Sequence, residues 1–443
     1  LKPTIMKKLL PVILLFITSL PLVAQDTIRE YWSNQKLMSE GIKVNGKEEG
    51  VWTYYYSTGE KWTQGTYKNG GKVGTWKVWY DNGRIWEEFT LPSGKFSSWF
   101  PSGQLEAEGM FKNGKRNGEW IFYHANGQLF KKANYLNDSV HGHVIEYYEN
   151  GKKHFDGSYD NGNLHGYAQW FDKDGQLEME GKSIHDLQDS TWSFYHANGK
   201  LGSKGNFLNG LQEGEWTYYY ETGEVWRKGS YEKGKREGLW QAWFESGKLQ
   251  RSGHFINDLE DGKWTVWFSD GKISDIGYFK KGQMHGDWIG YYENGRKRYT
   301  CQYADNERNG AYQLWDEMGL LRTEGSYAKD LKSGKWKEYS HVGKLVETGK
   351  YVKGKKNGKW TFYDLRGLKM REQNFVDDVT DGTFVEFYPN GQKQVQGTMK
   401  GRLRHGTWSY WAINGKLLYQ VDFKNGDRVK VHIDSDPSTK KPF

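Results

Sequence analysis

The chain has 443 residues, with 56 glycines, 8 prolines and one cysteine, and 16% of its residues are aromatic. Disordered linkers lack this aromatic content, so the composition predicts a folded protein that is rich in turns. A formal charge of +8 over this length is too dilute for the dense basic stripe of a nucleic-acid-binding protein, and a single cysteine, Cys301, excludes an internal disulfide.

Residues 1–25 predict a secretory signal peptide. Two lysines follow Met6, an apolar run extends from Leu9 to Val23, and Ala24-Gln25 ends the segment. These are the basic start, apolar centre and small-residue cleavage site of such a signal. A membrane anchor is the alternative, but the run has 15 residues and a spanning helix needs about 20. We therefore expect an exported protein, periplasmic or secreted, and nothing in the pattern indicates association with a membrane surface.

Residues 26–429 repeat a pattern of 24 residues. We number the positions of each unit from its leading glycine, so the unit that begins at Gly238 reads GLWQAWFESGKLQRSGHFINDLED. Position 3 is aromatic in 14 of 16 units, position 6 is aromatic in all 16, and position 10 is always glycine. Ser190 replaces one leading glycine, and Asp26 to Glu49 is a degenerate first copy, which makes about 17 units. A fixed period of this length is typical of a repeat architecture.

Each unit predicts a β-hairpin. Aromatic and β-branched residues flank the glycine turn at position 10, so we expect one strand over positions 2 to 8 and another over positions 12 to 19. A second turn is expected near position 21, which is usually Gly, Asp or Asn. The sequence shows no helical periodicity after the signal. The predicted fold is therefore all-β, an elongated open ribbon of antiparallel hairpins.

The expected register pairs position 3 with position 18. It places the glycine of position 16 opposite position 5, beneath rings such as Tyr54 and Tyr218. Trp at position 3 and Tyr or Phe at position 18 should then alternate in a ladder on one face, joined by Leu or Val at position 12. Position 6 has the other parity and should point to the opposite face.

Two segments depart from the repeat. The unit that begins at Gly74 has only 20 residues and contains Leu91-Pro92-Ser93, which predicts a kink near residues 84–95. After Val429 the chain leaves the pattern, and residues 430–443 are predicted to form a short cap and a disordered tail.

No constellation of catalytic or metal-binding residues emerges. Histidines that recur at one repeat position lie two strands apart, roughly 9 to 10 Å, which is too far to share an ion. The one His-x-His pair, His141 and His143, has no third ligand at the expected spacing. Cys301 occupies position 16, where most units carry glycine, and we expect it to be a small packed side chain. We therefore predict no catalytic residue, no metal site and no cofactor.

The aromatic stripe at position 6 is the candidate binding surface. Its strand neighbours are mostly polar, so a line of half-exposed rings at regular spacing suits a sugar ring or an extended peptide. Plain stabilisation of the sheet is the alternative interpretation. The candidate residues occupy four consecutive units: Trp243, Trp267, Tyr291 and Trp315.

The repeat resembles a known family. GSYEKGKREGLW from Gly229 to Trp240 and GMFKNGKRNGEW from Gly109 to Trp120 are similar to the MORN repeat. The longer unit, with its YYENG or FYHANG turn, resembles the bacterial MORN variant of YwqK-type antitoxins. The resemblance covers roughly Asp26 to Val429. It implies an elongated, twisted antiparallel β-ribbon used for binding or scaffolding, with no catalytic residues.

The sequence therefore predicts an exported, non-enzymatic binding or scaffold protein with an extended aromatic-lined surface. Its expected partner is a protein or a cell-envelope polymer. An antitoxin or immunity protein that neutralises a toxin is one alternative, and a glycan-binding or cell-envelope protein is another. A glycan-active enzyme is a third class, but we find no carboxylate pair on one face to support it.

Overall fold

The regular structure is entirely β. The computed structural model describes residues 27–434, and among these residues it contains 36 strands and no helix, which confirms the predicted fold class. The predicted signal peptide and the tail after residue 434 lie outside the described residues. The chain divides into two units, one up to Gln176 and one from Leu177 onward, and each is described by itself.

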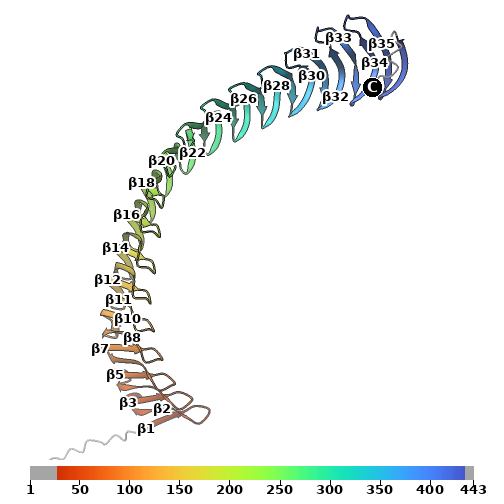
Figure 1. Cartoon of the computed structure of the whole chain (residues 1–443). Helices are drawn as coiled ribbons and strands as arrows, with labels where there is room; N and C mark the ends of the chain where they lie inside the picture. Colours follow the sequence, from red (N-terminus) through yellow and green to blue (C-terminus); the bar gives the residue numbers. More distant parts are fainter. Residues whose placement is uncertain (1–26, 435–443) are drawn as a thin grey trace, which may run out of the picture. The chain divides into compact units, whose positions relative to one another are not determined.

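The first unit is a sheet in which consecutive strands pair antiparallel, with β8 paired to both β9 and β10 (Figure 1). Its strands are β1 Thr27–Tyr31, β2 Leu37–Val44, β3 Lys47–Tyr55, β4 Lys61–Lys68, β5 Gly71–Trp79, β6 Ile85–Leu91, β7 Gly94–Trp99, β8 Leu105–Lys112, β9 Lys115–Arg116, β10 Gly118–Tyr123, β11 Leu129–Leu136, β12 Ser139–Tyr147, β13 Lys153–Asp160 and β14 Asn163–Phe171.

The second unit continues the same scheme, and each strand again pairs antiparallel with its neighbours in sequence (Figure 1). Its strands are β15 Leu177–Ile184, β16 Leu187–Tyr195, β17 Leu201–Leu208, β18 Leu211–Tyr219, β19 Val225–Glu232, β20 Lys235–Trp243, β21 Leu249–Ile256, β22 Leu259–Trp267, β23 Ile273–Lys280, β24 Gln283–Tyr291, β25 Lys297–Ala304, β26 Glu307–Trp315, β27 Leu321–Ala328, β28 Leu331–Tyr339, β29 Leu345–Val352, β30 Lys355–Tyr363, β31 Lys369–Val376, β32 Val379–Phe387, β33 Lys393–Lys400, β34 Leu403–Trp411, β35 Leu417–Lys424 and β36 Asp427–Asp434.

Each 24-residue repeat supplies two strands. The second strand covers positions 12 to 19 as predicted, but the first begins three residues before the leading glycine and ends at position 6. The final strand, Asp427–Asp434, runs across the boundary predicted at 429. Around the predicted kink, β6 and β7 pair directly, with Phe89 opposite Phe96, and the kink itself stays a prediction.

The predicted register was wrong by two residues. Trp240 at position 3 lies opposite Gly253 at position 16, and Phe255 at position 18 lies opposite Gly238. The cause is the loop, which takes five residues because the amide of Phe244 at position 7 donates to the carbonyl of position 11. A shift of two preserves the side-chain faces, so the ladder of Trp and Tyr or Phe forms as expected.

The ring that covers the strand glycine was also misassigned. It belongs to position 3 of the following unit, so that Trp240 lies over Gly229, and a Cβ at Gly229 would approach the indole to 2.2 Å. The indole nitrogen of Trp240 donates to the carbonyl of Ser230, at 3.0 Å. The ring is therefore both seated on the neighbouring strand and hydrogen-bonded to it, and its exposed fraction is only 5%.

Residues at the two sides of this contact are matched in size. Wherever position 16 carries a side chain, the following position 3 is not tryptophan, and the described pairs of this kind are Phe89 with Phe96, Ala133 with Val144, Cys301 with Tyr312, and Gln373 with Phe384. Conversely, Gly157 faces Ala168, whose Cβ leaves the space that Phe155 fills. The indole thus fills the volume that a Cβ at position 16 would need.

We expect the two sides of this contact to be energetically coupled. Gly229→Ala should lower the free energy of unfolding by about 1–3 kcal/mol in the wild type, because the new methyl group overlaps the indole. In a Trp240→Val background, which copies the Ala133 and Val144 pair, the same change should cost less than about 0.5 kcal/mol. Chemical denaturation of the four variants measures the coupling. An equal cost in both backgrounds would show that the ring does not set the size of position 16.

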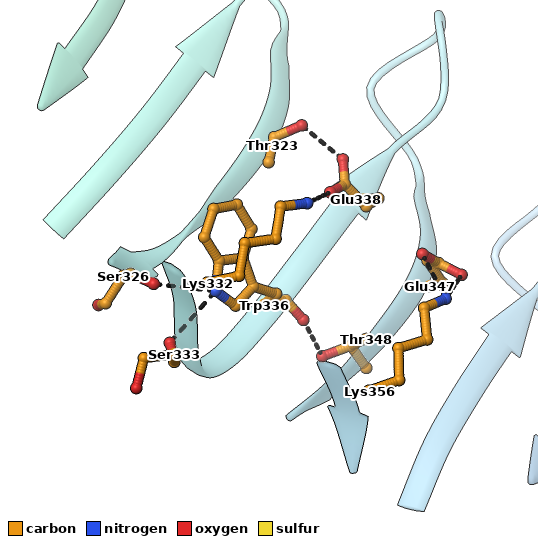
Figure 2. Close-up of polar contacts among 9 residues, drawn as sticks. All are labelled: Thr323, Ser326, Lys332, Ser333, Trp336, Glu338, Glu347, Thr348 and Lys356. Carbon is orange, nitrogen blue, oxygen red and sulfur yellow. Dashed lines mark hydrogen bonds and ion pairs between the residues drawn. The ribbon is translucent and has the colours of Figure 1, made fainter. Parts of the chain in front are cut away.

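Lysine and arginine side chains cover the ladder from outside. Lys332 lies 4.2 Å from the ring centroid of Trp336, and Lys356 lies 4.1 Å from that of Trp360. Figure 2 shows Lys332 crossing the indole of Trp336, whose nitrogen donates to the carbonyls of Ser326 and Ser333. The aliphatic stems exclude water and the charged ends stay at the surface. This is how Trp336 becomes fully buried on one face of a sheet.

The leading glycine occupies the left-handed region of backbone space. Gly214 has φ +65°, and a Cβ there would meet nothing within 4 Å, so only backbone strain disfavours a side chain. Ser190, which replaces this glycine in one unit, has φ +59°. A serine in this conformation is strained by roughly 1 kcal/mol.

Replacing Ser190 should therefore reveal that strain. Ser190→Gly should raise the free energy of unfolding by up to about 1 kcal/mol, an effect reduced by the greater entropy of glycine in the unfolded chain. The reverse change at an equivalent position, Gly214→Ser, should lower it by about 1 kcal/mol. Urea unfolding of both variants provides the test, and a destabilised Ser190→Gly protein would contradict this account.

The ladder also predicts alkaline sensitivity. Burial, followed by the charges of Glu347 and Glu338, raises the pKa of Tyr351 to about 12. The unfolded value is about 10, so the contribution is present below about pH 10 and is lost as the pH rises toward 12. The urea midpoint should therefore fall above pH 10, and Tyr351→Phe should make that fall shallower. An unchanged pH dependence in this variant would exclude Tyr351 as a contributor.

Candidate functional site

The two faces of the sheet differ in what they leave exposed. We call the face that carries positions 3, 5, 14, 16 and 18 the ladder face, and the opposite face, with positions 4, 6, 12 and 15, the row face. On the ladder face, Trp240, Phe255 and Trp264 pack into one buried cluster. Candidate surfaces are therefore the row face and those places on the ladder face where the packing is interrupted.

The four predicted residues lie at equivalent places on the row face. Trp243, Trp267, Tyr291 and Trp315 end β20, β22, β24 and β26, and each is half-buried. Two strands separate successive members, which corresponds to a spacing of roughly 9 to 10 Å. The hydroxyl of Tyr292 donates to the backbone carbonyl of Trp315 at 2.8 Å, so the turn of one unit holds the strand end of the next.

Position 12 joins this row, which corrects a prediction. Leu249 lies directly opposite Trp243, because a β-bulge between Ala242 and Trp243 shifts the register at the strand end. Residues that face each other across two strands share a face. The Leu or Val of position 12 was assigned to the ladder face from simple alternation, and the bulge reverses that assignment.

In some other units the position 6 ring is a tyrosine whose hydroxyl is hydrogen-bonded to a carboxylate. The hydroxyl of Tyr339 donates to Glu324 at 2.9 Å, and that of Tyr195 donates to Glu180 at 2.6 Å. Burial, together with the negative Glu324, raises the pKa of Tyr339. In the candidate stretch, the matching position 15 is not a carboxylate, and its residues are Lys228, Ser252, Ile276 and Thr300.

Sequence reasoning missed a hollow on the ladder face beside His196. In some other units a ring at position 13 packs against position 7, as Trp226 does against Tyr220 with 6.2 Å between the ring centroids. The unit that begins at Ser190 has Gly202 at position 13, so this ring is missing. A hollow of about 480 Å³ opens there, lined by Phe194, His196, Gly202, Tyr218, Tyr220 and Trp226.

A second, smaller hollow lies next to it. Position 5 often carries a ring, such as Tyr218 or Phe194, but in β20 it is Ala242. The missing ring leaves a space of about 90 Å³ that is lined by three arginines: Arg227, Arg236 and Arg251. The signals for both hollows were a Gly and an Ala at positions where other units carry rings, visible only once the register is known.

Histidines and carboxylates outside these places form local pairs. Nε2 of His143 lies 2.6 Å from Asp156, and Nδ1 of His141 lies 3.2 Å from Asp160. Burial opposes ionisation of Asp156, but hydrogen bonds from Lys153 and His143 outweigh it and lower the pKa of that carboxyl. Within residues 27–434 no three His, Cys, Asp or Glu side chains gather as a metal site requires.

The remaining reactive groups are packed or separated. Cys301 is buried opposite Trp288, and burial raises the pKa of its thiol. Glu88 forms an ion pair with Lys77 at 3.4 Å, while burial, together with the charge of Glu106, raises the pKa of Glu87. The described chain also includes no helix of the length and apolar character needed to cross a bilayer.

Comparison with known proteins identifies the family. The model of the MORN repeat variant matches more than half of the chain, and the protein therefore belongs to this family. The matched segments are residues 48–69, 72–90, 92–113, 116–137, 140–161, 164–183, 188–209, 212–233, 236–257, 284–305, 380–400 and 404–425. The fold and the family define a repeat scaffold or binding protein. No curated protein matches the chain.

The chain also matches several solved structures. It matches a crystal structure of TcdB2-TccC3-Cdc42 with 12% identity and a TM-score of 0.15, over 89% of this chain and 23% of that one. It matches a structure of a Photorhabdus luminescens Tc holotoxin pore with the same identity and TM-score, over 94% of this chain and 26% of that one. The chain thus spans about a quarter of the length of these structures.

Proposed function

We propose that this protein is exported and acts as a non-enzymatic binding or scaffold protein, holding an extended partner along its row face. The partner is a protein or a cell-envelope polymer. The observation that carries this proposal is the row itself: Trp243, Trp267, Tyr291 and Trp315 are each partly exposed on the row face at regular intervals. Position 3 rings on the ladder face, such as Trp240 and Trp264, are instead buried by packing.

The geometry of the row favours an extended ligand. A partner that repeats at short intervals can contact several rings, and each contact adds to the affinity without a deep pocket. Exposed aromatic rings are also the side chains that most often dominate binding energy. The backbone under the row is held by bonds such as that from Tyr292 to Trp315, so little conformational entropy is lost on binding.

An antitoxin or immunity role is a narrower form of the same proposal, in which the partner is a toxin. It rests on the resemblance of the repeat to YwqK-type antitoxins. Export of the chain, inferred from residues 1–25, argues against this narrower form, because such a toxin and antitoxin would normally meet in the cytoplasm. A glycan-binding or cell-envelope role differs only in the chemistry of the partner.

The row predicts a separation of binding from stability. Replacing Trp243 and Trp267 with Ala should weaken binding by about 1 to 3 kcal/mol per ring while the fold survives. Replacing Trp240 and Trp264, which are 5% and 3% exposed, should instead lower stability by about 3–5 kcal/mol each. A glycan and peptide array with both double variants, together with melting curves, measures both effects. If both variants lose stability equally and the wild type binds nothing on the array, the row is structural.

A further inference from the structure

The two hollows on the ladder face of the second unit adjoin through one side chain. The guanidinium of Arg227 lies 4.2 Å from the ring centroid of Tyr218 and 4.5 Å from that of Trp226. Both rings line the larger hollow, and Arg227 lines the smaller one. We call the larger one the aromatic hollow and the smaller one the arginine hollow. A ligand in the aromatic hollow therefore lies next to the arginine hollow, with Arg227 between the two.

Ala242 is the centre of the arginine hollow. It lies directly opposite Arg227 on one neighbouring strand and opposite Arg251 on the other. The guanidiniums of Arg236 and Arg251 lie against Phe255 and Trp264, at 4.0 and 4.3 Å from the ring centroids. The rings hold these cations in place, so little side-chain entropy remains to be lost when an anion binds.

The charges around Ala242 are not balanced. Arg236 pairs with Asp258 at 3.0 Å, and Arg251 pairs with Glu260 at 3.2 Å. Arg227 has no carboxylate within ion-pair distance among residues 27–434, and its buried Nε lacks a hydrogen-bond acceptor there. Three cations and two anions leave one positive charge in this hollow, and the carboxylate of Glu221 lines the neighbouring one. A single carboxylate would neutralise it and could accept paired hydrogen bonds from a guanidinium.

The neighbouring hollow indicates what carries that carboxylate. Its lining is mostly aromatic, and Trp226 is 40% exposed. Flat exposed rings beside a fixed cation suit a sugar ring, which can lie on the indole and place its own carboxylate against Arg227. We infer that these two hollows form one binding site for a carboxylated glycan of the uronic-acid type. The site lies on the ladder face and does not depend on the row.

The test measures binding of polygalacturonate fragments by calorimetry at low salt. The wild type should bind them, and affinity should fall as salt is added. Fully methyl-esterified fragments, which keep the sugar ring and lose the charge, should bind at least about tenfold more weakly. Poly-glutamate, which carries carboxylates on a peptide, should also bind more weakly because it lacks a ring for Trp226.

Three variants locate the site. Ala242→Phe fills the arginine hollow with the ring that Phe362 supplies at the same position, and it keeps every charge. Gly202→Phe fills the aromatic hollow, as Phe130 does beside His124 at 4.9 Å. Arg227→Gln removes the unpaired cation. Each change should weaken polygalacturonate binding about tenfold or more.

Arg371→Gln is the matched control. Arg371 occupies the same repeat position as Arg227 and lies 4.4 Å from the Phe362 ring centroid, but no alanine hollow adjoins it. This variant loses the same charge and should bind like the wild type. Wild-type protein that does not bind the fragments, or that binds poly-glutamate equally well, would overturn the inference. An equal loss in Arg371→Gln and Arg227→Gln would do the same, since binding would then reflect charge alone.

Discussion

The contact between a tryptophan and the glycine of the preceding strand pair is the interaction on which the rest of the structure depends. The indole of Trp240 occupies the space that a Cβ of Gly229 would need, and its nitrogen binds the next carbonyl, of Ser230. One ring thereby contributes apolar burial, a satisfied donor and a defined register. Because each unit supplies the ring for its predecessor, stability is shared between neighbours rather than held in one core.

This packing decides which surfaces are available for function. Position 3 rings on the ladder face are covered by their neighbours and by cations such as Lys332 over Trp336. The row face carries one ring per unit, because position 6 points away from the ladder, and lysines lie over only some of these rings, such as Lys153 over Phe171. A ligand can therefore meet regularly spaced rings on one face. On the other face it finds access at hollows such as those beside Gly202 and Ala242.

Departures from the repeat are the places where the surface of one unit differs chemically from that of the others. Gly202 and Ala242 each remove a ring that other units carry, and the two resulting hollows meet at Arg227. Ala133 with Val144 is a departure of another kind, since the change on one strand is compensated on the next. Uncompensated departures create space, whereas compensated ones preserve the packing. This distinction separates candidate sites from neutral variation in a repeat protein.

The sequence by itself determined the all-β repeat, both turns, and the alternation of Trp with Tyr or Phe, because a 24-residue period and glycine positions constrain local structure directly. It also placed Trp243 and Trp240 on opposite faces, since an error of two residues in register leaves parity unchanged. Only the tertiary structure decided that Trp240 covers Gly229, that Leu249 joins the row, and that Arg227, Ala242 and Arg251 line one hollow. Those facts depend on loop length and on a bulge, whose hydrogen bonds join residues that no local pattern relates.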